Sequence, residues 1–191
     1  IAAAVARIVQ ADATARITGA ALLPTVDFNA SARRIRTSQT TAVGGTTRIP
    51  LGSTSVTTSV QVQGKDVETS DLPEVEFRRA MHDYFKAMGI PIRRGRGFTA
   101  EDGPNSAPTV IVNEAMARRV FGNDDPIGQH IRTGPNPSGP WSTVVGVIGD
   151  VRHTGLEDAP VAEMYIYHLQ GPPVAPFIVV RTSTDPADMA D

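Results

Sequence analysis

Alternating apolar and polar residues predict that most of this chain folds as short β-strands. Residues 56–62 end in Val60, Gln61 and Val62, and Gly64 then closes a turn. A period of two is typical of a strand with one buried face. Residues 91–98 are extended and basic, and further strands are predicted at residues 75–79, 108–112, 141–151, 163–167 and 176–181.

The first part of the chain has a different pattern, a helix followed by a strand. Residues 1–22 are rich in alanine, which favours a helix, and Pro24 ends it. Apolar and polar residues then alternate over residues 25–33. The helix fits either an amphipathic surface helix or a close-packed helix of an assembly. The strand fits either an ordinary sheet or a membrane β-barrel, and these alternatives stay open.

Two helices are predicted among the later strands, at residues 81–88 and 114–121. Gly89 occupies the C-cap position of the first helix. Asn113 is a favourable N-cap residue for the second, and Gly122 ends it. One face of the first helix carries the large apolar side chains, Met81, Tyr84, Phe85 and Met88.

Charged residues near these helices have a simple helical interpretation. Glu114 and Arg118 are spaced to form a pair on one helix face. Residues 99–102 resemble a capping box with aspartate at its last position. Glu101 and Asp102 are therefore interpreted as helix-cap groups, because anions favour helix N-termini.

A stretch rich in Ser, Thr and Gly over residues 37–58, broken by Gly44 and Gly45, predicts a linker. We therefore divide the chain into a helix–strand segment, residues 1–44, and a main domain, residues 45–191. Because strands outnumber helices and do not alternate regularly with them, the predicted fold class is α+β.

Composition narrows the possible functions. The 191 residues carry a net charge of −2 and no cysteine, which gives no general attraction to nucleic acid and excludes thiolate chemistry. No segment reaches the roughly 20 apolar residues of a membrane-spanning helix. The chain begins at Ile1 and stops within a predicted helical turn, so we expect a fragment of a longer protein.

Catalytic patterns are scarce. No phosphate-binding P-loop occurs, and the basic stretch at residues 93–98 lacks the glycine spacing of a dinucleotide site. Asp150 and His153 lie close in sequence after a strand, so a metal or acid–base role is one hypothesis. A surface hydrogen-bonding role is favoured, because residues near a strand end need not face the same way. We therefore assign no catalytic, cofactor-binding or metal-binding residue.

Five segments in the main domain form an ordered set of motifs. They are residues 84–91, 94–102, 110–121, 125–128 and 144–151, with supporting stretches at 49–52, 61–64, 164–167 and 179–181. This order resembles the periplasmic core domain of MacB-like, FtsX-type ABC permeases. The resemblance covers about residues 46–191.

The resemblance implies a porter-like part and an inserted, mostly β part. It implies a non-catalytic domain of an efflux permease, on the periplasmic face of the inner membrane in a bacterial cell envelope. Implied partners are the transmembrane and ATPase parts of the same transporter and a periplasmic adaptor. The alternative is an envelope module that binds a small ligand or peptide in an apolar pocket near Trp141 and Tyr165.

The N-terminal segment resembles a different efflux component. Residues 2–11 and 21–32 resemble a TolC/NodT-type outer-membrane efflux protein, in which a helix leads into a strand of a β-barrel. This second resemblance, over residues 1–43, implies an outer-membrane efflux channel as a further partner. It also implies either a fusion of neighbouring components or an artificial join, and predicts poor packing on the main domain.

Overall fold

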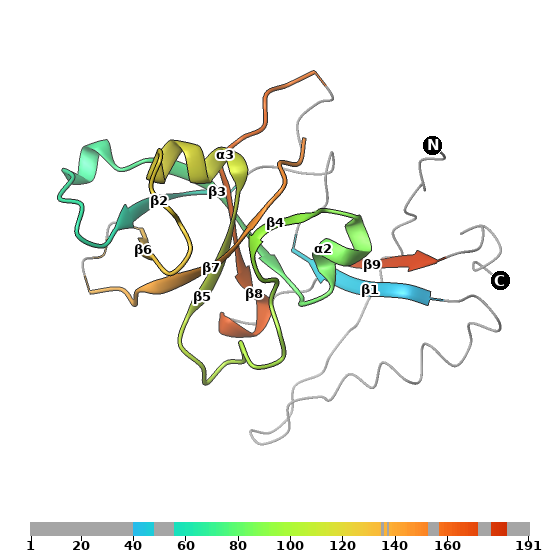
Figure 1. Ribbon diagram of the computed structural model, residues 1–191. Coiled ribbons are helices and arrows are strands. Elements are labelled where there is room, and N and C mark those ends of the chain that lie inside the picture. The colour runs from blue at the N-terminus through green and yellow to red at the C-terminus, as the bar shows by residue number, and fades with distance from the viewer. Residues whose placement is uncertain are drawn as a thin grey trace.

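The computed structural model describes residues 40–47, 56–134, 136, 138–152, 157–171 and 177–182 (Figure 1). The strands in this part are β1 (Thr40–Thr46), β2 (Thr57–Val62), β3 (Glu74–Ala80), β4 (Ile92–Gly95), β5 (Thr109–Asn113), β6 (His130–Thr133), β7 (Ser142–Ile148), β8 (Glu163–Tyr167) and β9 (Phe177–Thr182). The helical elements are η1 (Thr69–Asp71), α2 (Tyr84–Met88), α3 (Glu114–Met116), η2 (Ala117–Phe121) and η3 (His168–Gln170).

Six strands close into a ring, called here the closed sheet. Their order is β2–β6–β7–β5–β8–β3, and β3 pairs again with β2. The pairs β3–β8 and β5–β7 are parallel, and the other four pairs are antiparallel. Closing the ring gives hydrogen-bond partners to strands that would form the two edges of an open sheet.

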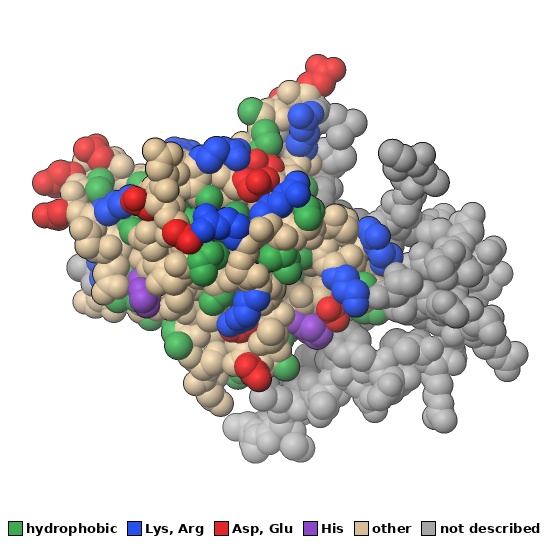
Figure 2. Space-filling view, in the orientation of Figure 1, with side chains coloured by type: hydrophobic (Ala, Val, Ile, Leu, Met, Phe, Trp, Pro, Cys, Tyr) green, Lys and Arg blue, Asp and Glu red, His purple; other side chains and the backbone are tan. Residues whose placement is uncertain are grey.

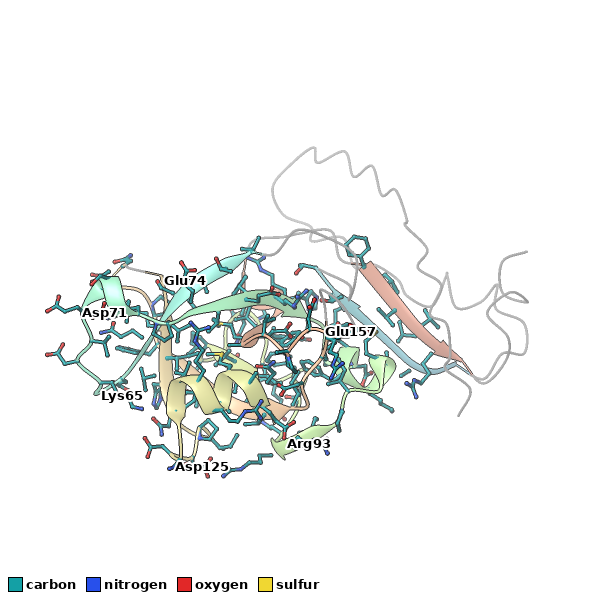
Figure 3. All side chains as sticks on the ribbon, turned by 90° about the horizontal axis from the view of Figure 1, so that it is seen from above. Lys65, Asp71, Glu74, Arg93, Asp125 and Glu157 are labelled. Atoms are coloured by element: carbon teal, nitrogen blue, oxygen red, sulfur yellow. The ribbon has the colours of Figure 1, made fainter. Side chains whose placement is uncertain are left out.

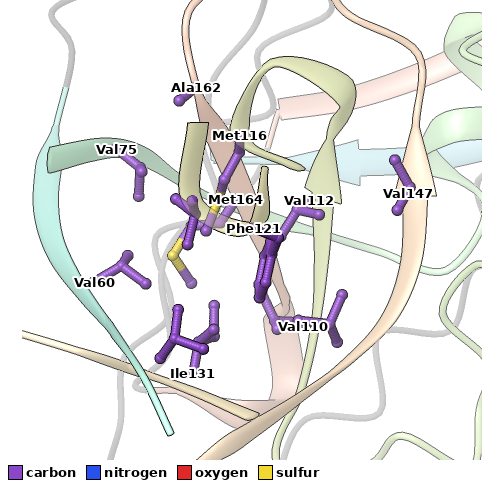
Figure 4. Packing of buried hydrophobic residues seen from close by; sticks show 13 residues of the cluster. Val60, Val75, Val110, Val112, Met116, Phe121, Ile131, Val147, Ala162 and Met164 are labelled. Carbon is purple, nitrogen blue, oxygen red and sulfur yellow. The ribbon is translucent and has the colours of Figure 1, made fainter. Parts of the chain in front are cut away.

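The interior of the closed sheet is filled by aliphatic side chains and one aromatic ring (Figure 4). Strand β5 shows how the two faces divide: Val110 and Val112 belong to this interior cluster, and Ile111 belongs to a second cluster outside. The elements α3 and η2 add Met116, Val120 and Phe121 to the interior, where they complete the packing between opposite strands.

The second cluster lies on the outer face of β5, β7 and β8, beneath α2 and the β1–β9 pair. Five aromatic rings dominate it, with centroid distances of 5.1–6.2 Å between neighbours: Tyr84, Phe85, Phe98, Tyr165 and Tyr167. Both faces of the central strands are therefore covered, which explains their continuous apolar character.

The β1–β9 ribbon extends from the closed sheet on its β3 side (Figure 1). Strand β1 pairs along its whole length with β9, and its last residue, Thr46, pairs with Ala80 of β3. In this ribbon Thr40 is opposite Thr182. The places where the chain enters and leaves the described fold therefore lie side by side.

Asn113 fastens the start of α3 to β8. Its Oδ1 accepts hydrogen bonds from the backbone N–H groups of Met116 (2.8 Å) and Glu163 (2.9 Å). Its Nδ2 donates to the carbonyl oxygen of Val161 (2.7 Å). The predicted N-cap is confirmed, and the same side chain also ties together two strands of the closed sheet.

The prediction of a linker over residues 37–58 is wrong in two places. Residues Thr40–Thr46 form β1, and β2 begins at Thr57. The predicted domain boundary after residue 44 falls inside β1. Gly44 is needed there for close packing: a Cβ atom on it would lie 2.5 Å from the Cα atom of Tyr84. The close approach of the Tyr84 backbone, and not a need for a flexible linker, explains why glycine occupies this position.

Two other local predictions are wrong. No helix follows residues 99–102, which form a turn. Glu114 and Arg118 do not pair with each other in the described ion pairs: Glu114 lies 3.8 Å from Arg93, and Arg118 lies 2.9 Å from Asp150. The short strand β6 was not predicted at all.

Most other elements were predicted from the sequence. The strands β2, β3, β5, β7, β8 and β9 and both predicted helices are confirmed, with ends shifted by a few residues. The many strands and few helices of the described part are compatible with the α+β class. The predicted helix at residues 1–22 and strand at residues 25–33 lie outside the described residues.

Candidate functional site

Asp150 lies at the start of α3, where its carboxylate binds the first helical turn. One oxygen accepts from the N–H of Ala115 (2.7 Å) and the other from Nη2 of Arg118 (2.9 Å). An anion is favourable at this position. His153, its partner in the acid–base hypothesis, lies outside the described residues. Both carboxylate oxygens of Asp150 therefore hold the helical segment formed by α3 and η2 in place.

The described ranges contain no group of three or more His, Cys, Asp or Glu side chains arranged to hold a metal ion. Among these residues, likewise, no helix has the length and apolar character needed to cross a membrane.

The basic stretch forms the exposed strand β4 and its continuation, and each of its arginines has an acidic partner. Arg93 pairs with Glu114, and Arg94 pairs with Asp125. Arg96 binds both carboxylate oxygens of Asp102 at 2.6 and 2.8 Å. Figure 2 shows blue and red side chains mixed over this face. A phosphate group would have to compete with these carboxylates, which explains why the stretch is not an open anion site.

Asp102 closes the turn at residues 99–102 and does not cap a helix. Its Oδ2 accepts from the N–H of Thr99 (2.8 Å), which is the backward half of a capping box. The two bonds from Arg96 hold the pKa of this carboxyl below its usual value, against the opposing effect of burial. Asp102 therefore anchors β4 and the loop that follows it.

A buried cluster of charges lies on the outer face of β3 and β8. The guanidinium of Arg78 pairs with the carboxylates of Glu76 and Glu163, and all three residues are buried. Tyr165 donates a 2.7 Å hydrogen bond from its hydroxyl group to Glu163. The sequence predicted this strand at residues 75–79, but it did not reveal that the face carrying Glu76 and Arg78 is covered.

The three tyrosines of the chain surround this region and the adjacent core. Burial raises the pKa of Tyr84 to about 12. Burial, reinforced by the nearby charge of Glu163, raises the pKa of Tyr165 well above its usual value. Burial also raises the pKa of Tyr167, with a contribution from Asp102. All three phenols are therefore held neutral in the folded protein.

We expect none of these tyrosines to ionise near pH 10 while the protein stays folded. Because the folded state keeps these protons more tightly, it is stabilised fully below pH 10, and that stabilisation is lost as pH rises through about 12. Phenolate absorbance at 295 nm and circular dichroism, followed together during an alkaline titration, test this. The phenolate absorbance should rise only when the circular dichroism shows unfolding. A full rise in absorbance near pH 10, while the dichroism stays that of the folded protein, would contradict the prediction.

Among the hollows on the surface of the described part are two that lie beside η2. The larger, of about 430 Å³, lies between β2, the loop that joins β2 to β3, and η2. The smaller, of about 220 Å³, lies between β4 and η2, where Arg93, Arg94 and Arg118 meet Glu114 and Asp124. The larger of these two hollows is lined by more aliphatic residues, among them Val62, Val67 and Leu72, and is called here the tip hollow. The sequence pattern did not reveal this hollow, although the acidic residues of the loop between β2 and β3 are apparent in the sequence.

Tyr165, one of the two residues near which a ligand pocket was predicted, is fully buried. Its ring packs against Tyr84 and Phe85 in the second cluster. Trp141 instead has the guanidinium of Arg132 over its ring at 4.5 Å, a cation–π contact. The two residues therefore have separate structural roles.

The described part is thus a closed sheet with an appended ribbon, and many of its charged side chains form ion pairs with one another. The chain belongs to the MacB-like periplasmic core domain family, whose model matches residues 2–190. This confirms the resemblance seen in its motifs: the chain is a periplasmic domain of the MacB-like ABC permease class. The match also includes residues 2–43, which favours a MacB-like assignment of that segment over a TolC/NodT-type one.

Individual relatives agree with the family. A 73-residue segment is 27% identical to the macrolide export ATP-binding/permease protein MacB of Aggregatibacter actinomycetemcomitans, covering 38% of this chain and 11% of that protein. The periplasmic region of MacB from Actinobacillus actinomycetemcomitans has a TM-score of 0.55 and 19% identity, covering 82% of this chain and 64% of that one.

The fold also occurs outside Gram-negative bacteria. The extracellular domain of the ABC-type transporter YknZ from Gram-positive bacteria has a TM-score of 0.50 and 16% identity, covering 76% of this chain and 66% of that one. At such identities the likeness shows the fold alone. The chain spans only part of the length of each of these relatives.

Proposed function

We propose that this chain is the non-catalytic domain through which an ABC-type exporter permease transmits conformational change to a periplasmic adaptor. Its other partners are the transmembrane and ATPase parts of the same transporter, at the periplasmic face of the inner membrane. The porter-like part is assigned to the β1–β9 ribbon and its neighbours, and the inserted part to the closed sheet. The membership of residues 2–190 in the MacB-like family supports this proposal.

The β1–β9 ribbon is the observation that carries the proposal. It holds Thr40 opposite Thr182 and joins β3 through Thr46 and Ala80. A movement of the flanking chain would thus reach the closed sheet through paired backbone. Buried packing of α2 against β1 and β9 makes this connection stiff, because close-packed interiors transmit displacement.

A chimera tests the proposal. The chain would replace the periplasmic domain of a MacB-like permease, and export of a macrolide would be measured in a strain that lacks the native transporter. We expect partial export. In a matched variant, four-residue Gly-Ser linkers inserted before Thr40 and after Thr182 should abolish export and leave the fold intact. Equal export with and without the linkers, or none from a well-expressed chimera, would contradict the proposal.

A further inference from the structure

The loop between β2 and β3, called here the tip loop (residues 63–73), lies at the opposite end of the described fold from the β1–β9 ribbon. Figures 1 and 3 show this from two directions, with Lys65 and Asp71 at one end and the ribbon at the other. Because the chain enters and leaves at the ribbon, the tip loop is the end best placed to meet a partner approaching from outside.

The tip hollow lies beneath this loop and reaches the interior packing of the closed sheet. Its floor includes Val60, Val62 and Val120, which are 0%, 6% and 9% exposed and belong to the interior cluster. Leu72 and Pro73 also line it. Val67, on the wall, is 37% exposed. An aliphatic side chain entering here would exchange water for contacts with several apolar groups.

The loop beside the hollow is acidic, and its Asp71 lines the hollow itself. Asp66, Glu68, Asp71 and the neighbouring Glu74 are all exposed, and Figure 2 shows acidic side chains gathered at this end. Lys65, the one cation of the tip loop, is held against η2 by Asp124 at 3.5 Å and by the carbonyl oxygen of Val120 at 3.4 Å. With four acidic residues and one lysine, the sequence 63–74 carries a net charge of −3.

We infer that the tip hollow is a docking site for a basic, apolar segment of a protein partner. An aliphatic side chain would enter between Val67, Leu72 and Val120, and lysine or arginine residues on either side of it would meet the acidic tip loop. Charge complementarity of this kind selects a partner and speeds its association. The inference rests on the proposed function, in which the partner is the periplasmic adaptor.

Arg119 limits the orientation of the segment. It lines the hollow on the η2 side, opposite the acidic loop. The basic residues of the partner are therefore expected along the loop and away from η2. An acidic segment would instead be drawn toward Arg119 and repelled by Asp66 and Asp71, so the surface discriminates between the two charges.

A peptide titration of the whole chain, followed by NMR, tests the inference. The probe is the heptapeptide Lys-Lys-Ala-Leu-Ala-Lys-Lys, compared with a version carrying Gly in place of Leu and one carrying Glu in place of every Lys. We expect chemical-shift changes centred on residues 60–73 and 119–120. We expect about fivefold weaker binding without the leucine, because an aliphatic side chain is no longer buried.

Variants of the chain separate a specific site from general charge attraction. The variant D66N/E68Q/D71N should bind the probe about tenfold more weakly, since exposed ion pairs are individually weak and are removed together. The control E101Q/E157Q/D158N removes the same number of exposed acidic groups elsewhere and should bind like wild type. Val67→Ser should weaken binding of the leucine peptide and leave that of the glycine peptide unchanged.

Several outcomes would overturn the inference. They are absence of binding at millimolar peptide, equal binding of the acidic peptide, equal loss in the control variant, and shifts centred away from the tip loop. The chimera experiment is independent of all four. If the chimera exports only without the Gly-Ser linkers and the chain does not bind the peptide, the docking site alone is rejected. If the chain binds the peptide but the chimera does not export, the proposed function alone is rejected.

Discussion

Replacing Arg78 by methionine is expected to destabilise the folded domain by about 3–5 kcal/mol, the usual cost of removing one partner from a buried ion pair. Arg78 is 4% exposed and lies between Glu76 and Glu163, which are 8% and 0% exposed. Methionine has a similar length but no charge, so both carboxylates would lose their shared cation. Most domains are stable by only about 5–15 kcal/mol, so the loss removes a large part of the total.

Chemical denaturation of wild type, Arg78→Met and two comparison variants measures this effect. Arg93→Met removes an exposed arginine whose pair with Glu114 spans 3.8 Å, and should change stability by less than about 1 kcal/mol. The triple variant E76Q/R78M/E163Q removes the charges together and should recover part of the loss, because no uncompensated carboxylate is left. A loss from Arg78→Met no larger than that from Arg93→Met would show that the cluster is not essential.

This cluster also shows where sequence reasoning stops. The sequence predicted a strand at residues 75–79; in the structure Val75 and Phe77 face the interior cluster, and Glu76 and Arg78 lie on the opposite face. A polar face is normally solvent-exposed. Here α2 and the β1–β9 ribbon cover the outer layer, and β9 is about 100 residues away along the chain. Burial of the second face depends on those distant contacts, which no local pattern contains.

Helix ends were predicted correctly where they depend only on residues close in sequence. The capping bond of Asn113 and the αL turn at Gly89 (φ 72°) involve neighbours within four residues, so their residue types were sufficient evidence for these two features. Asp102 shows the opposite case. Its position suggested a cap, but Arg96, the residue after β4, binds it, and the backbone then turns without forming a helix. Local motifs are ambiguous when a distant or competing partner takes the key side chain.

Closure of the sheet was beyond prediction for a similar reason. Strand β6 has four residues between two turns, too few to show a period. Its pairings with β2 and β7 join parts of the chain about 70 and 10 residues away. The tip hollow exists only because the closed sheet brings β2 next to η2, so the candidate docking site was hidden with it.

Substitution of Gly146 by alanine is expected to cost about 3 kcal/mol, at the upper end for an added methyl group in a packed site. A Cβ atom at this position would lie 2.1 Å from the carbonyl oxygen of Arg96 and 3.4 Å from Ile111. The first contact is with backbone, so no side-chain rotation relieves it. Strand β4 pairs with β7 at this point, Gly95 opposite Gly146, and the two strands would have to separate.

Gly103→Ala is the matched control, because its added Cβ atom would lie 3.6 Å from the nearest oxygen, an ordinary contact. Its stability should change by no more than about 1 kcal/mol. Hydrogen exchange adds a local measurement: in Gly146→Ala, protection should fall first at Arg96, whose N–H donates to Val145 at 2.9 Å. Equal denaturation midpoints for the two variants would contradict the close crossing of β4 and β7, since only that crossing distinguishes the two glycines. A loss of stability without faster exchange at Arg96 would place the strain elsewhere and reject the proposed separation of the strands.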